Sequence, residues 1–306
     1  MEDSPVWSLG SLTLDPDRTD PNGVLWFLSE ETGFFGSPAP TAELTPKLNA
    51  HGAFRTPGYK PQRTISLKGY AFAPSYAKLR DAVNTVTGLL GGPYESAPLT
   101  CYAETGPVTC EVFLDGDILT QPVPAANPIV EWSLQVVAPD PRRYSTQWRT
   151  MRATLPRTGE DGLDFLPEDD PEGLDFTEGL DFGVDSGAGF LAMTNRGTAP
   201  APLMLTLYGP LTMPTLTAGS TGTYSTLRYN GTLAEGEFVV IDPSAPTVLL
   251  GGTASRRELL NPAEFQGFYV PPRRNARPGE LSVGLSHSGP ATDTGWVEVR
   301  FRDAWF

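Results

Sequence analysis

Short runs of alternating apolar and polar residues mark the N-terminal half of the chain, and this period of two predicts strands with one buried face. Residues 130–136 alternate Val, Trp, Leu and Val with polar residues. Residues 64–72 place four small or apolar residues on one side, namely Ile65, Leu67, Gly69 and Ala71. We expect both runs to be half-buried strands.

One segment of this half has a helical period instead. Between residues 75 and 90, apolar residues recur at steps of three and four, as on an amphipathic helix. The stripe consists of Tyr76, Leu79, Val83, Val86 and Leu90. Ser75 is a typical N-cap, and Gly91-Gly92 a typical stop. We predict a single helix over about residues 75–90, packed on a sheet of its own domain.

The C-terminal half has strand patterns and no helical pattern of useful length. Turn signals such as Asn230-Gly231 and Gly251-Gly252 separate short apolar runs at roughly ten-residue spacing, which is typical of a β-sandwich. The candidate strands are residues 203–208, 224–229, 238–242, 247–250, 265–270, 281–286 and 296–301.

The chain is long enough for about two domains, and Gly and Pro together form about a fifth of it, as in proteins with many strands and turns. We predict a mainly β fold. Its parts are a β-sandwich-like domain with one helix (1–150), a connector (151–190) and a C-terminal β-sandwich (191–306).

The connector is strongly acidic. Residues 159–186 contain eleven acidic residues, no Lys or Arg, and three copies of Gly-Leu-Asp-Phe. Its charge density favours a flexible linker, but burying each large apolar side chain is worth roughly 1.5–3 kcal/mol. We therefore predict that at least two repeats dock on a domain surface through their Leu and Phe side chains, which are Leu163, Phe165, Leu174, Phe176, Leu180 and Phe182.

Two cysteines lie on a predicted hairpin of residues 99–103 and 108–114. A loop of residues 104–107 would place Cys101 opposite Cys110 on the apolar face. The pair is either a cross-strand disulfide or redox switch, or two buried thiols. Because the chain shows no secretion signal, we favour buried thiols.

Charge and hydropathy limit the classes of partner. The net charge is −14 and neither half has a basic excess, so binding to nucleic-acid phosphates is not expected. No run approaches the ~18 apolar residues of a membrane span, and residues 1–4 (Met-Glu-Asp-Ser) lack the pattern of a signal peptide. We expect no membrane anchor, and a protein that is either made and kept in the cytoplasm or exported by a route other than a signal peptide.

Catalytic chemistry is not predicted either. His51 and His287 are the two imidazoles of the chain, and residues 284–288 (Gly-Leu-Ser-His-Ser) lack the second glycine of a nucleophile elbow. Neither a P-loop nor a dinucleotide fingerprint occurs. Two Cys and two His do not make a convincing zinc site. We predict no enzyme activity, no cofactor and no metal.

Several segments nevertheless occur in the order and spacing of one family. They are residues 63–69 (Arg-Thr-Ile-Ser-Leu-Lys-Gly), 138–145 (Ala-Pro-Asp-Pro-Arg-Arg-Tyr-Ser), 193–199 (Met-Thr-Asn-Arg-Gly-Thr-Ala), 207–210 (Leu-Tyr-Gly-Pro), 235–242 (Glu-Gly-Glu-Phe-Val-Val-Ile-Asp) and 302–306 (Arg-Asp-Ala-Trp-Phe). Over nearly its full length the chain resembles the distal tail proteins of long-tailed, non-contractile bacteriophages, which are also described as minor tail or phage tail family proteins. The connector looks like the Gly-Leu-Thr-Phe-type repeat of versions from phages of actinobacteria, with Asp in place of Thr.

This resemblance implies a ring, commonly a hexamer, at the far end of a phage tail in the virion. N-terminal domains would form the ring, and galectin-like C-terminal sandwiches would project outward. The implied partners are further copies of the chain, the tail tube, tail-tip hub and tape measure proteins, and receptor-binding proteins. DNA would pass through without specific binding, and assembly would take place in the host bacterial cytoplasm.

The first sixty residues are rich in aromatics for so little regular pattern. They are either edge strands and arms buried by neighbouring subunits, which a ring requires, or an ordinary core contribution. The residues concerned are Trp7, Trp26, Phe27, Phe34 and Phe35. We further expect acidic side chains of the N-terminal domain to line the channel, because a neutral to acidic lumen lets DNA slide.

The alternative function is a carbohydrate-binding module for receptor recognition. Aromatic residues of the C-terminal sandwich would then stack on sugar rings, and the candidates are Tyr269, Trp296 and Trp305. The competing interpretation is that Trp296 and Trp305 pack against their own sandwich.

Overall fold

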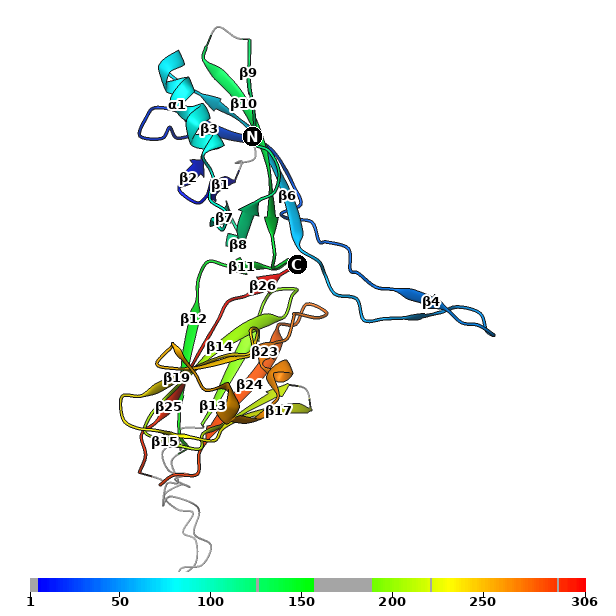
Figure 1. Cartoon of the computed structure of the whole chain (residues 1–306), viewed down its shortest axis with the longest axis vertical. Helices are drawn as coiled ribbons and strands as arrows, with labels where there is room; N and C mark the ends of the chain where they lie inside the picture. The colour runs from blue at the N-terminus through cyan, green and yellow to red at the C-terminus, as the bar shows by residue number, and fades with distance from the viewer. Residues whose placement is uncertain (1–4, 125–126, 157–188, 221, 291) are drawn as a thin grey trace, which may run out of the picture. The chain divides into compact units, whose positions relative to one another are not determined.

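The computed structural model describes residues 5–124, 127–156, 189–220, 222–290 and 292–306 (Figure 1). It divides into two units, the first formed by Met1–Thr146 together with Ala304–Phe306, and the second by Gln147–Asp303. The chain thus passes between the units twice, once after Thr146 and once after Asp303. The fold is mainly β, as the sequence predicted.

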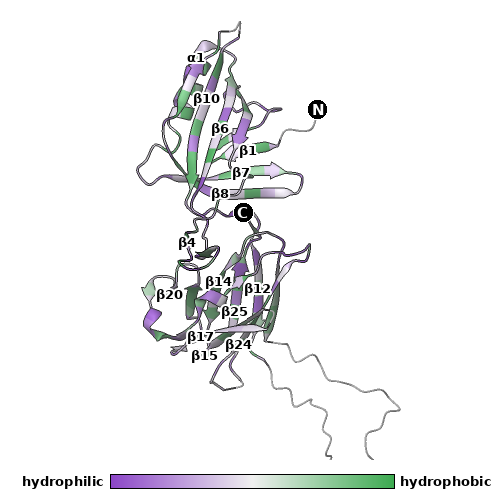
Figure 2. Ribbon diagram, turned by 90° about the vertical axis from the view of Figure 1, so that its right-hand side faces the viewer, coloured by the Kyte–Doolittle hydropathy of each residue, from purple (hydrophilic) through white to green (hydrophobic). Residues whose placement is uncertain are grey.

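Unit 1 is built on one antiparallel sheet in the order β2-β1-β7-β8-β10-β6-β3, with β9 and β11 paired to β10 and β8. Apolar and polar residues alternate along these strands, as Figure 2 shows for β6 and β10. The bounds are β1 (Val6–Leu9), β2 (Leu12–Leu14), β3 (Leu25–Thr32), β6 (Arg63–Phe72), β7 (Ser96–Ala103), β8 (Gly106–Leu114), β9 (Leu119–Pro122), β10 (Ile129–Ala138) and β11 (Arg143–Ser145).

Both predicted half-buried strands are confirmed, and they are neighbours. In β6 and β10, Leu67 lies opposite Leu134 and Gly69 lies opposite Trp132, and all four face the core. A Cβ atom on Gly69 would lie 2.5 Å from the Trp132 ring and 2.2 Å from the carbonyl oxygen of Phe27. The indole therefore needs glycine across the strand.

The predicted helix is present but shorter, and it spans α1 (Tyr76–Thr87). The Ser75 side chain accepts a hydrogen bond from the backbone N–H of Lys78 at 3.3 Å, which confirms the N-cap. The expected stop at Gly91-Gly92 is wrong, because Gly88 caps the helix and Leu90 turns the chain with φ +53°. Tyr76 is exposed in the first turn, and Ala82 takes a place on the buried face instead.

The cysteine hairpin forms with a different register. Ala103 pairs with Gly106, so the loop is only Glu104-Thr105, and Cys101 lies opposite Val108 rather than Cys110. Gly106 adopts φ +107°, which glycine tolerates, and this lets the strand begin two residues earlier than expected. Both cysteines are buried free thiols. Burial raises the pKa of Cys101 to about 11 and that of Cys110 to about 12.

Unit 2 is a β-sandwich, with bounds that differ from the expected 191–306. Its strand β12 lies at residues assigned to the N-terminal domain and the connector, and residues 304–306 belong to unit 1. One sheet has the order β12-β25-β14-β19-β20-β21 with β23 paired to β14, the other has the order β13-β24-β16-β17-β22, and β15 and β18 pair separately. The bounds are β12 (Arg149–Thr154), β13 (Phe190–Asn195), β14 (Ala201–Tyr208), β15 (Leu211–Thr212), β16 (Thr215–Ser220), β17 (Thr223–Tyr229), β18 (Thr232–Leu233), β19 (Phe238–Asp242), β20 (Thr247–Leu250), β21 (Ala254–Ser255), β22 (Leu260–Ala263), β23 (Tyr269–Val270), β24 (Gly279–Ser286) and β25 (Trp296–Phe301).

One predicted strand of unit 2 is wrong. Residues 265–270 begin with a 3₁₀ turn, Phe265–Gly267, and only Tyr269–Val270 pair as β23. A Cβ on Gly267 would lie 2.0 Å from the Ser225 hydroxyl oxygen, so glycine allows this turn to press against β17. Strands 238–242, 247–250 and 296–301 match their predictions in both bounds.

A buried arginine connects distant parts of unit 1. Arg63, at the start of β6, is 1% exposed. Its Nη1 donates to the carbonyl oxygens of Gly33 at 2.6 Å and Phe34 at 2.9 Å, and also to that of Gly36. Its Nε and Nη2 donate to the carbonyl of Pro141 at 3.0 and 2.7 Å. Burial lowers the pKa of Arg63, against the opposing effect of Cys110, Glu31 and Asp140.

The turn that presents Pro141 is itself held by Asp140. Its carboxylate accepts hydrogen bonds from the Arg142 backbone N–H at 3.0 Å and from the Tyr144 hydroxyl at 2.6 Å. Burial alone would raise the pKa of Asp140, but the hydrogen bonds from Arg142 and Tyr144 outweigh it and lower the pKa. The Asp-Pro-Arg-Arg-Tyr motif therefore fixes the carbonyl to which Arg63 donates.

The end of the chain returns to this region. Strand β26 (Ala304–Trp305) pairs with β11, and Arg143 donates from Nη2 to the carbonyl of Phe306 at 2.8 Å. The Phe306 ring lies 5.0 Å from the Lys60 ammonium. A two-residue strand thus attaches the C-terminus to unit 1.

The buried thiols lead to the first prediction. At pH 8 the native protein should react with iodoacetamide at least a hundredfold more slowly than the chain in 6 M guanidinium chloride, because the thiolate is the nucleophile and both pKa values are raised. Mass spectrometry of labelled Cys101 and Cys110 measures this. Equal labelling rates in the two conditions would contradict the burial of the pair.

Arg63 leads to the second prediction. Arg63→Met should lower the free energy of unfolding of unit 1 by about 3–5 kcal/mol, because buried carbonyls without a partner each cost about 1–3 kcal/mol. Amide hydrogen exchange in β6 and β10 at increasing urea reports on this unit. The matched control, Arg80→Met on the exposed face of α1, should stay within about 0.5 kcal/mol. Similar losses in both variants would show that the carbonyl contacts are unimportant.

Candidate assembly surface

A two-stranded arm leaves the sheet of unit 1 between β3 and β6. Its strands, β4 (Leu44–Pro46) and β5 (Ala53–Arg55), pair with each other and form a sheet of their own. Figure 1 shows this arm, residues 37–62, as a long ribbon leaving β6. Toward the base of the arm, the backbone N–H of Thr41 donates to the carbonyl of Tyr59 at 2.8 Å. The carbonyls that Arg63 binds lie at the entry to the arm.

The side chains of the arm are exposed along both strands. Four of them are large and apolar, with exposed fractions of 67% for Leu44, 99% for Leu48, 67% for Phe54 and 77% for Tyr59. An isolated two-stranded ribbon is marginally stable in water, and exposed apolar clusters of this kind mark protein–protein contacts. The arm is therefore the candidate assembly surface.

The charge of the arm is opposite to that of the rest of the chain. Residues 37–62 contain three basic residues, Lys47, Arg55 and Lys60, and one acidic residue, Glu43. The net charge of the whole chain is −14. An arm with a positive balance is electrostatically complementary to an acidic surface, including one on another copy of this chain.

The structure places three of the five candidate arm aromatics within the core of unit 1. Trp7, Trp26 and Phe34 are at most 4% exposed, and the rings of Trp7 and Phe34 meet edge to face at 4.8 Å. Phe27 is half-buried on β3, and Phe35 is exposed at the entry to the arm. Of the five candidates, Phe27 and Phe35 therefore keep enough exposed surface for a contact with a neighbouring subunit.

Sequence reasoning missed the four apolar residues of the arm. Each lies in a polar, Pro-rich stretch without alternation, because the ribbon has no face buried within its own chain. The available signal was Gly52, which turns the ribbon with φ +97° between two short apolar runs. Such a turn in a region with no other pairing partner indicates a free hairpin.

The other sequence-predicted sites fall on different parts of the chain. The connector residues Leu163, Phe165, Leu174, Phe176, Leu180 and Phe182 lie outside the described residues, and their docking stays a prediction. Tyr269 borders a cavity of unit 2, whereas Trp305 belongs to β26 in unit 1. The Trp296 ring stacks on Tyr208 at 4.0 Å and lies under the Arg152 guanidinium at 4.4 Å. Within unit 2, Tyr269 lies opposite Pro202 and Trp296 opposite Tyr208, so these two candidate sugar-stacking residues lie at opposite ends of β14.

Among the described residues, no three His, Cys, Asp or Glu side chains gather in a way that would hold a metal ion. No described helix is long and apolar enough to span a bilayer.

Comparison with known proteins gives likeness in structure alone. No family model matches the chain, and no curated protein matches its sequence. Among solved structures, the chain is similar to the Dit protein (gp 19.1) of phage SPP1, described as a paradigm of the hub adsorption apparatus in phages that infect Gram-positive bacteria. The TM-score is 0.64 at 10% identity, over 99% of this chain and 100% of that chain.

Two structures of the phage p2 baseplate in its activated conformation also resemble the chain at 10% identity. For the structure with Ca the TM-score is 0.49, over 98% of this chain and 98% of that chain. For the structure with Sr it is 0.46, over 97% of this chain and 98% of that chain. The end-to-end likeness to Dit establishes the fold, in which a helix-bearing β unit is joined to a β-sandwich.

Proposed function

We propose that this protein is a structural subunit of the tail-tip hub of a bacteriophage, where several copies form a ring. Two independent lines of support converge on this function. The fold follows that of the SPP1 Dit protein from end to end, and the sequence segments quoted above resemble distal tail proteins. Dit is described as part of a hub adsorption apparatus, which supports a structural role, and we assign the chain no catalytic one.

The exposed arm is the single observation that carries the ring. Leu44, Leu48, Phe54 and Tyr59 on the arm are each at least 67% exposed, and burying each would contribute roughly 1.5–3 kcal/mol. An arm that grips a different surface on the next subunit makes a heterologous contact. Such contacts generate rings when the rotation closes.

The charge of the arm favours another copy of the chain as its partner. The arm carries an excess of basic residues, whereas the remainder of the chain is strongly acidic. Charge complementarity of this kind raises association rates and fixes the register of contacts. Free strand edges of β4 and β5 offer backbone groups that a neighbour can pair with.

The remaining parts of the proposal follow from the resemblance. The ring has six subunits and joins the tail tube to the tail-tip hub, next to the tape measure protein, and the sandwiches support receptor-binding proteins. Acidic side chains of unit 1 line the channel, so that DNA passes without binding. The Gly-Leu-Asp-Phe connector docks on a domain surface of the assembly.

The third prediction tests the arm. Native mass spectrometry of the full chain at 20–50 µM should show a closed oligomer of six subunits, and Leu44→Ser with Phe54→Ser should shift it to monomer. Both residues are exposed in the isolated chain, so the variant should fold normally and keep the far-UV circular dichroism spectrum of the wild type.

A matched control separates the arm from general surface hydrophobicity. Tyr94→Ser with Tyr224→Ser removes two aromatic rings outside the arm, which are 92% and 73% exposed, and should leave the oligomer intact. A wild-type chain that stays monomeric at 20–50 µM would contradict the proposed contact between the arm and the next subunit. An arm variant that still forms a ring would contradict it as well.

A further inference from the structure

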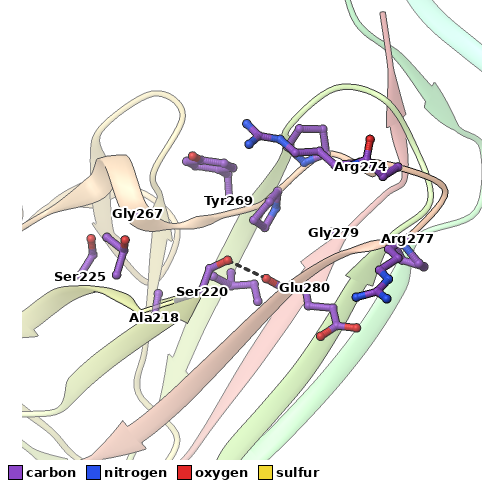
Figure 3. A pocket seen from close by; sticks show the side chains of 15 residues that line it. Ala218, Ser220, Ser225, Gly267, Tyr269, Arg274, Arg277, Gly279 and Glu280 are labelled. Carbon is purple, nitrogen blue, oxygen red and sulfur yellow. Dashed lines mark hydrogen bonds between the residues drawn. The ribbon is translucent and has the colours of Figure 1, made fainter.

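Unit 2 contains an open cavity of ≈ 900 Å³ at one end of its sandwich. Its walls come from the end of β16, the start of β17, the start of β24 and the segment that follows the Phe265–Gly267 turn. Figure 3 shows its residues, with Ser220 and Ser225 on one wall and Tyr269 on another. All of its lining residues belong to unit 2.

One wall offers a flat aromatic surface over a narrow floor. Tyr269 is 40% exposed, and Pro271 and Pro272 follow it along the rim. At Gly279, a Cβ would lie 1.8 Å from the carbonyl oxygen of Pro271, so the rim and β24 approach each other as closely as glycine allows. The two prolines, Gly279 and the Tyr269 ring limit the conformations that this wall can adopt without a ligand. This reduces the entropic cost of binding.

The rim carries two cations on a rigid turn. Arg274 and Arg277 exchange backbone hydrogen bonds, with N–H···O distances of 3.0 and 2.9 Å, around Asn275 and Ala276. Those two residues adopt φ +48° and +63°, and the value is unusual for alanine. Among the described residues, neither guanidinium has an ion-pair or hydrogen-bond partner. They are free to bind an anionic ligand in an otherwise acidic chain.

The opposite wall supplies hydroxyl groups. Thr223 and Ser225 lie at the start of β17, and Ser220 ends β16, where its hydroxyl donates to the backbone carbonyl of Glu280 at 2.9 Å. The Glu280 side chain also lines the cavity and can accept hydrogen bonds. An aromatic face, several hydroxyls and two guanidinium groups together suit a ligand that is part apolar, part hydroxylated and part anionic.

The backbone of the cavity argues against a peptide ligand. Strands β16 and β24 each have paired neighbours on both sides, and β22 pairs with the second half of β17, so little free edge remains for an added strand. The rim contains Pro271, Pro272 and Pro278, which have no N–H to donate. Recognition must therefore come from side chains, as is typical for sugars. Two arginines are also too few for nucleic-acid binding driven by phosphates.

We propose that this cavity binds an acidic oligosaccharide. A sugar ring packs its apolar face on Tyr269, its hydroxyl groups bond to the serine and threonine wall, and its carboxylate or phosphate groups bind Arg274 and Arg277. A volume of ≈ 900 Å³ lies near the upper end for ligand pockets, which suits several sugar units rather than one. The site lies within unit 2 and does not depend on ring formation.

The fourth prediction is tested on the full chain by isothermal titration calorimetry. Two acidic probes distinguish the source of the charge: hexagalacturonate for carboxylates, and a hexasaccharide of phosphodiester-linked hexoses for phosphates. At least one should bind with a dissociation constant below 1 mM, and at least tenfold more tightly than neutral maltohexaose. Hexaglutamate and inorganic phosphate should bind at least tenfold more weakly than that glycan.

Variants connect the binding to the named residues. Arg274→Gln with Arg277→Gln should weaken it at least tenfold, whereas Arg256→Gln with Arg257→Gln, the same charge change outside the cavity, should leave it within twofold. Tyr269→Ala should weaken it at least fivefold, and Tyr269→Phe should restore it because the ring face remains. Circular dichroism confirms folding of each variant.

Several outcomes would overturn the proposal. One is that neither acidic glycan binds with a dissociation constant below 1 mM. Another is that maltohexaose binds as tightly as the better acidic glycan. Equal binding of hexaglutamate or inorganic phosphate would point to a simple anion site, as would binding that does not change in Tyr269→Ala. A failed ring assembly with intact glycan binding would reject the proposed hub function and leave this inference standing.

Discussion

The buried guanidinium of Arg63 is the contact on which the arrangement of unit 1 depends. One side chain donates to carbonyls at the entry to the arm and to Pro141 in the turn after β10. These segments are far apart along the chain and share no strand pairing. A charge that is almost fully removed from water persists only when its donors are satisfied, so the arm leaves the sheet at a fixed point.

The polar motifs of the sequence have a common structural meaning: they hold turns. Asp140 fixes the turn that presents Pro141, and the buried Asn195 closes its own loop by accepting from the N–H of Gly197 at 2.8 Å. In unit 2, Asp303 accepts the backbone N–H of Arg196 at 2.9 Å and binds Arg149. Such positions tolerate little change, because each buried polar group needs its own partner.

The sequence predicted elements that bury a face within their own chain. Strands β6 and β10 and helix α1 were foreseeable, because burial imposes a period on them. The hairpin of Cys101 and Cys110 was placed in the wrong register, since the two-residue turn depends on the backbone of Gly106. The arm has no buried face to reveal it, and the cavity is lined by residues far apart in sequence, such as Ser220 at the end of β16 and Arg274 in the turn before β24. Strand β26 is too short for any pattern.

The double passage of the chain between its units makes unit 2 an insertion within unit 1. Its first and last strands, β12 and β25, are paired from Arg149–Phe301 to Thr154–Trp296, so both ends of the insertion emerge side by side. A module with adjacent ends can be exchanged by recombination without breaking the host sheet. Evolution can therefore exchange the sandwich as a module while the returning strand β26 preserves the sheet of unit 1.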